Sequence, residues 1–192
     1  MAGAAGGACA KKHLRAMNDA PAVRPPGIFI SYRRADTAPY ARLLQVELGA
    51  RFPCVPVFMD LDSIEPGLDF AAIIRDAVGS CCVMVVLIGR QWAVLTDEDG
   101  RRRLDDPDDY VRYEIRGALK RGIRTIPVLI DGAAMPRQEH LPHDLRRLAR
   151  LHALDLGCDR YRYDVDRLAD IVGRALAAEA GLAGAGDPAA PL

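Results

Sequence analysis

Short runs of continuous hydrophobic residues alternate with amphipathic stretches along the chain. Four of these runs are rich in β-branched or aromatic side chains: GIFISY (27–32), VPVFM (55–59), CCVMVVLI (81–88) and TIPVLI (125–130). A weaker fifth run, LHALDL, covers 151–156. Strands that are buried on both faces of a parallel sheet have this nearly continuous hydrophobicity. The pattern therefore predicts five parallel strands.

The segments between these runs have the spacing of amphipathic helices. Two examples are Ala41, Leu44, Leu48 and Phe70, Ile73, Ile74, Ala77. A last helix is expected after Tyr163. Alternating strands and helices predict an α/β, flavodoxin-like three-layer fold with a five-stranded parallel sheet and helices on both faces. In such sheets ligands bind beyond the carboxyl ends of the strands.

The chain is divided by its composition into a domain and two tails. Residues 1–26 are rich in Ala, Gly and Pro and are expected to be a disordered leader. Residues 27–178 form the predicted domain, and 179–192 read as a flexible tail or linker stub of low complexity. A chain of 192 residues is long enough for one such domain with a hydrophobic core.

The charge and hydropathy of the chain exclude several classes of protein. Lysine plus arginine and aspartate plus glutamate both number 26, so the formal net charge is zero and no nucleic-acid partner is indicated. No apolar run approaches the ~20 residues of a membrane span. The N-terminal stretch lacks the apolar core of a secretory signal. We therefore expect no membrane contact and a cytoplasmic location.

Motifs for several other chemistries are missing from the sequence. It contains no GxGxxG after the first predicted strand, no GxxxxGKS/T, no HExxH and no GxSxG. The five cysteines form no CxxC pair, and Pro142 between His140 and His143 disfavours a metal pair on a regular helix. A phosphorelay receiver would need an aspartate at the end of the third strand, where this chain has Gly89. We predict neither a metal nor a cofactor.

Polar and aromatic residues follow three of the predicted strands. The first runs into SYRRAD, where Arg33 and Arg34 offer forked donors either to a phosphate or to surface carboxylates. The second runs into the acidic loop MDLDSIEPGLDF, in which Pro66-Gly67 fits a tight turn. The third ends in IGRQW, and Trp92 there is either a packing anchor or a surface for stacking on a planar ligand.

The stretch DDPDDYVRYEIRGALKRG (105–122) predicts a helix with a carboxylate beside its core face. Asp106 fits the N-cap and Pro107 the first helical position. The expected core stripe is Val111, Ile115, Ala118 and Leu119. Glu114 lies about 60° from Val111 at 100° per residue, on the margin of this stripe, with Tyr110 one turn before it. Such a carboxylate is either a solvated charge or a group that reaches a cleft at the sheet edge.

At these residues the chain resembles a Toll/interleukin-1 receptor (TIR) domain. The resemblance covers Gly27 to about Leu176 and follows, in order, IFISYRRAD, VFMDLDSIEPG, CCVMVVLIGRQW, DYVRYEIRGAL and IPVLIDGAAMP. The pattern is most similar to the bacterial, NAD-cleaving type. In enzymatic members an aromatic residue followed four positions later by glutamate marks the catalytic helix. The resemblance therefore implies that Glu114 is catalytic; Tyr110 stands where the family usually has Trp, and Ser63 where the animal enzyme has lysine.

The resemblance also implies a substrate, a set of contacts and partners. The predicted substrate-binding residues are Tyr32, Arg33, Arg34, Asp60, Asp62, Gly67, Trp92 and Tyr110. The implied activity is an NAD+ glycohydrolase or ADP-ribosyl cyclase that releases nicotinamide and ADP-ribose or a cyclic isomer, with NAD+ as substrate. We further expect TIR–TIR self-association, a downstream effector that responds to a cyclic nucleotide product, and a role in bacterial anti-phage defence. The alternative is a non-enzymatic interaction module.

Overall fold

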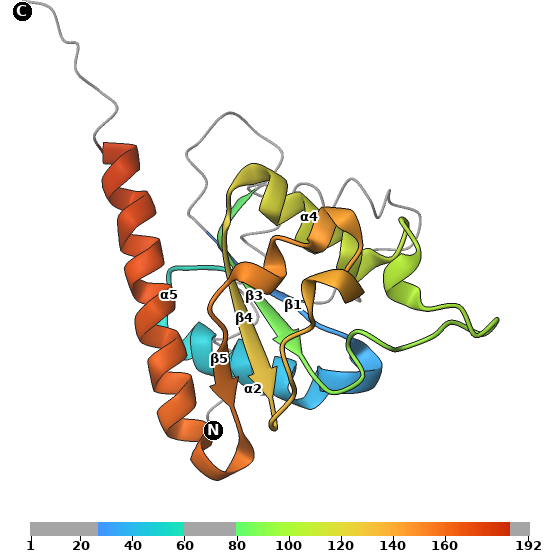
Figure 1. Ribbon diagram of the computed structural model, residues 1–192. Coiled ribbons are helices and arrows are strands. Elements are labelled where there is room, and N and C mark those ends of the chain that lie inside the picture. Colours follow the sequence, from blue (N-terminus) through green and yellow to red (C-terminus); the bar gives the residue numbers. More distant parts are fainter. Residues whose placement is uncertain (1–26, 60–79, 185–192) are drawn as a thin grey trace, which may run out of the picture.

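Five parallel strands form a single sheet in the part of the chain that the computed structural model describes, residues 27–59 and 80–184. Their order is β2-β1-β3-β4-β5 (Figure 1). The strands are β1 (Gly27–Ser31), β2 (Val57–Met59), β3 (Cys81–Ile88), β4 (Arg124–Ile130) and β5 (Leu154–Leu156). This order and direction confirm the predicted flavodoxin-like sheet.

The direction of strand addition reverses between β1 and β3. From β1 the chain first adds β2 on one side and then returns to add β3 on the other. β1 and β3 pair from Gly27 with Cys81 to Ser31 with Val86, so their carboxyl ends lie next to each other. In open α/β sheets a crevice for ligands forms at such a point, because the following loops diverge to opposite faces.

Helices cover both faces of the sheet, as Figure 1 shows. α2 (Arg34–Arg51) and α5 (Tyr161–Gly184) pack on one face, and α4 (Tyr110–Arg121) packs on the other. Short 3-10 segments connect the elements: η2 (Arg103–Asp105), η3 (Gln138–His140), η4 (His143–Leu145), η5 (Leu148–Arg150) and η6 (Cys158–Arg160). Alternate residues of β1 serve the two faces, since Ile28 and Ile30 contribute to the core with α2 and α5 while Phe29 contributes to the core with α4.

The predicted start of α4 is wrong by one short turn. Its N-cap is Asp109, whose side chain accepts the backbone N–H of Arg112 at 3.0 Å. Asp106 instead accepts the N–H of Asp108 at 2.9 Å, which closes a local turn before the helix begins. The expected core stripe Val111, Ile115, Ala118 and Leu119 is buried as predicted.

The limits of the predicted domain are only partly described. The leader 1–26 and the helix expected around residues 70–77 lie outside the described residues. α5 begins at Tyr161, slightly before its expected start, and continues to Gly184, beyond the expected domain end at residue 178. None of the described helices combines the length and the apolar character that crossing a bilayer requires.

Candidate active site at the carboxyl end of β1

Glu114 reaches the carboxyl end of β1. The Ser31 hydroxyl, on the last residue of that strand, donates a hydrogen bond to Glu114 Oε2 at 2.8 Å. Ser31 is 1% exposed, whereas Glu114 is half-buried. The core stripe of α4 thus faces the sheet, and the carboxylate on its margin turns to the strand end. Of the two positions that the sequence left open for Glu114, the structure has the one at the sheet edge.

Arg33 and Asp109 form a buried ion pair beside this contact. Arg33 Nη1 lies 2.6 Å from Asp109 Oδ2, and both side chains are 2% exposed. Arg103 Nε lies 3.4 Å from the same oxygen. The Nε and Nη2 atoms of Arg33 are buried without a hydrogen-bond partner among the described residues. Because Asp109 also caps α4, the pair fixes the start of the helix to the residues that follow β1.

The other predicted contacts near this edge differ in their exposure. Arg34 is exposed, and Tyr110, one turn before Glu114, is 53% exposed. Tyr32 is buried in the core that β1 shares with α2 and α5. The structure therefore brings Glu114, Tyr110 and the Arg33–Asp109 pair together at the start of α4, with Tyr32 directed into the core.

Trp92 is a packing residue in this structure. Its side chain is 0% exposed and lies in the core with Phe29 and α4, below the loop that follows β3. The indole Nε1 has no hydrogen-bond partner among the described residues. Of the two roles that the sequence left open, the structure supports the packing anchor, because no face of the ring is available for stacking.

Asp36 is a half-buried acid at this edge that the sequence pattern did not reveal. Its Oδ1 accepts the backbone N–H of Gln91 at 3.2 Å, which ties α2 to the loop after β3. A Cβ atom on Gly89 would lie 2.4 Å from Asp36 Oδ2. A side chain at position 89 would therefore have to displace the Asp36 carboxylate, the end of a half-buried side chain. Neither Asp36 nor Ser31 carries a sequence signal, since each acts through a distant segment.

An open cleft of about 730 Å³ lies at the start of α4, next to Tyr110. Most of its lining is acidic: Asp97, Glu98, Asp99, Asp106, Asp108 and Asp109, together with Thr96, Arg103 and Tyr110. The pKa of Asp97 is lowered, first by the hydrogen bond from the backbone N–H of Arg101. Arg102 lowers the pKa of Asp105 in the same loop. The cleft is therefore anionic at neutral pH, which favours a cationic group beside the helix start.

Some predicted contacts fall outside the described part of the chain. Asp60, Asp62 and Gly67, in the acidic loop after β2, are not among the described residues. Within the ranges 27–59 and 80–184, no group of three or more His, Cys, Asp or Glu side chains could hold a metal ion.

Comparison with known proteins identifies the family of the chain. A fly protein (Drosophila melanogaster) described as "NAD(+) hydrolase sarm1" is 29% identical over 143 residues, which cover 73% of this chain and 10% of the fly protein. The TIR domains of the activated Roq1 resistosome, which recognises the pathogen effector XopQ, have the same fold with a TM-score of 0.54 and 15% identity, covering 78% of this chain and 98% of theirs. The sequence pattern that defines the TIR domain matches residues 28–172. The chain therefore belongs to the TIR domain family.

Proposed function

We propose that this TIR domain cleaves NAD+ at the nicotinamide–ribose bond, with Glu114 as the catalytic carboxylate. The observation that supports this most directly is the hydrogen bond from Ser31, which holds Glu114 at the carboxyl end of β1 beside the reversal of the sheet. The similarity to a fly protein that is named as an NAD+ hydrolase supports the same substrate. Because the match covers a small part of that protein, the activity is assigned to this chain as a proposal.

The chemistry needs only one such carboxylate. Cleavage of a glycosidic bond passes through an oxocarbenium-like state, and ordinary glycosidases also supply an acid that protonates the departing oxygen. Nicotinamide departs from a pyridinium and becomes neutral without a proton. A fixed negative charge that stabilises the developing positive charge on the ribose is then the main requirement. Water would capture the ribose to give ADP-ribose, and an adenine nitrogen or ribose hydroxyl would give a cyclic isomer.

The electrostatics of the site suggest how NAD+ is oriented. The acidic cleft beside Tyr110 favours the cationic nicotinamide, and it disfavours the diphosphate. Arg34 is exposed next to β1 and is the cation we assign to the diphosphate, whereas Arg33, which is 2% exposed and paired with Asp109, is assigned to fixing the start of α4. Asp60, Asp62 and Gly67 remain predicted contacts of NAD+. Trp92 is assigned to packing in the core beneath the loop that follows β3.

The substitution Glu114→Gln tests the assignment. It keeps the shape of the side chain and removes its charge. We expect kcat for nicotinamide release to fall by roughly 10²–10³-fold, as for the loss of one preorganised contact to a transition state. Glu139→Gln, at an exposed glutamate on η3, is the matched control and should leave kcat unchanged. Near wild-type turnover by a well-folded Glu114→Gln protein would remove Glu114 from the mechanism.

The same assay addresses assembly and product. We propose that the loop 60–69 contributes to TIR–TIR self-association, so specific activity should rise with protein concentration. Chromatography of the products would separate ADP-ribose from a cyclic isomer, the form to which a downstream effector in anti-phage defence would respond. A folded wild-type protein that leaves NAD+ intact at every concentration would favour the non-enzymatic interaction module.

A further inference from the structure

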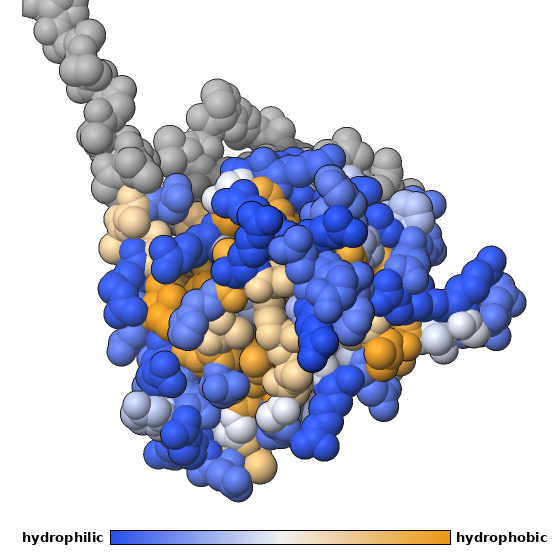
Figure 2. Space-filling model, viewed as in Figure 1, coloured by the Kyte–Doolittle hydropathy of each residue, from blue (hydrophilic) through white to orange (hydrophobic). Residues whose placement is uncertain are grey.

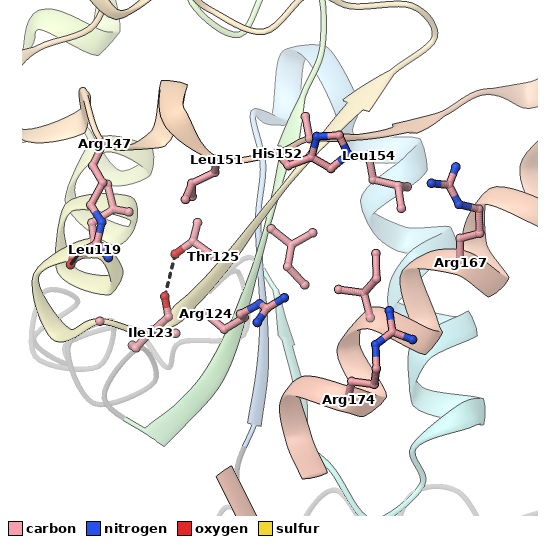
Figure 3. A pocket seen from close by; sticks show the side chains of 14 residues that line it. Leu119, Ile123, Arg124, Thr125, Arg147, Leu151, His152, Leu154, Arg167 and Arg174 are labelled. Carbon is pink, nitrogen blue, oxygen red and sulfur yellow. Dashed lines mark hydrogen bonds between the residues drawn. The ribbon is translucent and has the colours of Figure 1, made fainter. Parts of the chain in front are cut away.

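A second cleft, of about 410 Å³, lies at the amino edge of the sheet (Figure 3). β5 begins at Leu154, which pairs with Val128 of β4. β4 itself begins four residues before Val128, at Arg124, so the first part of β4 has no strand neighbour on the β5 side among the described residues. The residues Arg124 to Ile126 therefore border a notch on the β5 side. α5 and the segment 147–153 form the other walls of this notch.

This cleft is separate from the candidate active site. Glu114 contacts the carboxyl end of β1, whereas the cleft is built where β4 and β5 begin. Leu119 of α4 and the C-cap residue Gly122 border the cleft at the opposite end of the helix from Tyr110. The eight residues from Glu114 to Gly122 correspond to roughly 12 Å along the helix axis. A ligand in this cleft would not contact Glu114.

Four of the six polar side chains that line the cleft are arginines. The charged or titratable residues among the described lining are Arg124, Arg147, Arg167, Arg174 and His152, and no aspartate or glutamate is among them. Figure 3 shows Arg124 in the middle of the cleft, with Arg167 and Arg174 of α5 on one side and Arg147 on the other. The whole chain has zero formal net charge, so this concentration of arginine is local.

No described carboxylate forms a salt bridge with any of these four arginines, and the same is true of Arg42 and Arg162 outside the cleft. Among the described residues, salt bridges involve Arg33, Arg51, Arg101, Arg102, Arg103, Arg112, Arg116, Arg137 and Arg160. None of these bridges includes an arginine of the cleft. Arg147 donates to the Leu119 carbonyl at 3.3 Å, and the Arg167 guanidinium lies 5.8 Å from the Tyr163 ring centre. All four arginines are exposed, so solvent and salt screen their mutual repulsion, and a bound polyanion would supply the counter-charge.

Beneath the arginines the cleft has an apolar floor. Ile126 and Leu154 are buried there, and Leu151 and Ile171 complete it. In the space-filling view, apolar surface is visible between α5 and the neighbouring strands, bordered by hydrophilic side chains (Figure 2). The volume is within the range of small-molecule sites, about 300–1,000 Å³. The forked guanidinium groups match the oxygens of phosphate better than a single point charge would.

We propose that this cleft binds a small molecule that carries a diphosphate group, at a site distinct from Glu114. The two sources of such a group are an inorganic polyphosphate and a nucleotide. The guanidinium groups of β4 and α5 would contact the phosphates, and the apolar floor would accept the uncharged part of a nucleotide. The inference does not depend on the catalytic role of Glu114.

Isothermal titration with inorganic pyrophosphate, ADP and adenosine tests the proposal. The cleft variant is Arg124→Gln with Arg174→Gln. The control variant is Arg42→Gln with Arg162→Gln, two exposed helical arginines outside the cleft that give the same change in charge. Circular dichroism would check that both variants are folded. Titrations at about 50 mM and about 300 mM NaCl would measure the electrostatic part of binding.

We expect pyrophosphate to bind at one site, more weakly at the higher salt concentration, and adenosine to bind far more weakly than ADP. The cleft variant should raise the pyrophosphate Kd by on the order of tenfold or more, because each charge-assisted contact is worth about that factor. The control variant and Glu114→Gln should leave this Kd within about twofold of wild type. Tighter binding of ADP than of pyrophosphate would identify a nucleotide as the occupant, and equal binding a polyphosphate.

Two results would overturn the proposal. One is an absence of saturable pyrophosphate binding, or an equal loss in the cleft and control variants. The other is a cleft variant that changes the sedimentation coefficient of the protein while pyrophosphate binding is unaffected, which would assign the arginines to a protein interface.

Discussion

The hydrogen bond from Ser31 to Glu114 gives a quantitative test of how the carboxylate is held. In Ser31→Ala the hydroxyl that donates to Glu114 Oε2 at 2.8 Å is lost, while the packing around β1 changes little because Ser31 is small and buried. Glu114 keeps its charge but loses the group that fixes its position. We therefore expect a loss of turnover that is smaller than the loss in Glu114→Gln.

The magnitude follows from the type of contact. A hydrogen bond to a charged group is worth about 1.5–3 kcal/mol, and water can replace part of it here because Glu114 is half-buried. The lower end of this range corresponds to a roughly tenfold fall in kcat. The effect on folding should be about 1 kcal/mol, or a Tm lower by roughly 2–4 °C for a domain of this size. KM for NAD+ should stay near its wild-type value, since the bond acts on the reacting centre.

A double-mutant cycle separates positioning from packing. Initial rates of nicotinamide release would be measured for wild type, Ser31→Ala, Glu114→Gln and the double variant at saturating NAD+. If Ser31 acts through Glu114, its substitution should change kcat by less than about twofold once the carboxylate is already lost. The same fold-loss in both backgrounds would refute this reasoning, as would wild-type kcat in Ser31→Ala.

Three further predictions concern groups around the same edge. Gly89→Ala should lower the free energy of unfolding by about 1–3 kcal/mol in urea, because its Cβ would lie 2.4 Å from the Asp36 carboxylate, and adding Asp36→Ala should recover part of this loss. Burial raises the pKa of the Cys81 thiol to about 12. The protonated thiol therefore makes its full contribution to stability below the ordinary pKa of about 8.5, and this contribution is lost as the pH rises towards 12. Iodoacetamide at about pH 8 should label the exposed Cys54 in the native protein and Cys81 only after unfolding, as read by mass spectrometry. Arg33→Ala should destabilise the fold by about 3–5 kcal/mol in the same urea titration, because it leaves a buried carboxylate without its main partner, and an effect confined to KM would instead assign Arg33 to the substrate.

A strand could be predicted from the sequence where its residues are apolar for one reason only, namely burial within the sheet. β3 was expected at 81–88 and is observed there, because its eight continuous apolar residues, all buried except the half-buried Cys82, lie in a central strand that is covered on both faces. β5 was expected at 151–156, but only Leu154–Leu156 pair with β4. Leu151 is apolar because it packs against the core and borders the arginine-lined cleft. Hydrophobicity alone does not distinguish these two reasons for burial.

The site was predictable in position and unpredictable in its partners. The helical angle between Glu114 and Val111 places the carboxylate at the margin of the core stripe, and this follows from sequence alone. Its partner Ser31 is 83 residues away, and no local pattern connects them. The prediction of where α4 starts was wrong for a related reason. Several aspartates before the helix could serve as the cap, and the choice of Asp109 coincides with its ion pair to Arg33 across the sheet edge.

The two contacts between β1 and α4 have matching spacings. Ser31 and Arg33 are two residues apart in extended chain, which places them on one side and about 6.6 Å apart. Their partners Glu114 and Asp109 are five residues apart, about 7.5 Å along the helix axis, and the helix runs in the opposite direction. The buried ion pair therefore sets the same alignment of helix and strand that the Ser31–Glu114 bond requires. We infer that Arg33 contributes to the position of the Glu114 carboxylate without contacting the substrate, because a shift of α4 along the strand would separate both pairs together.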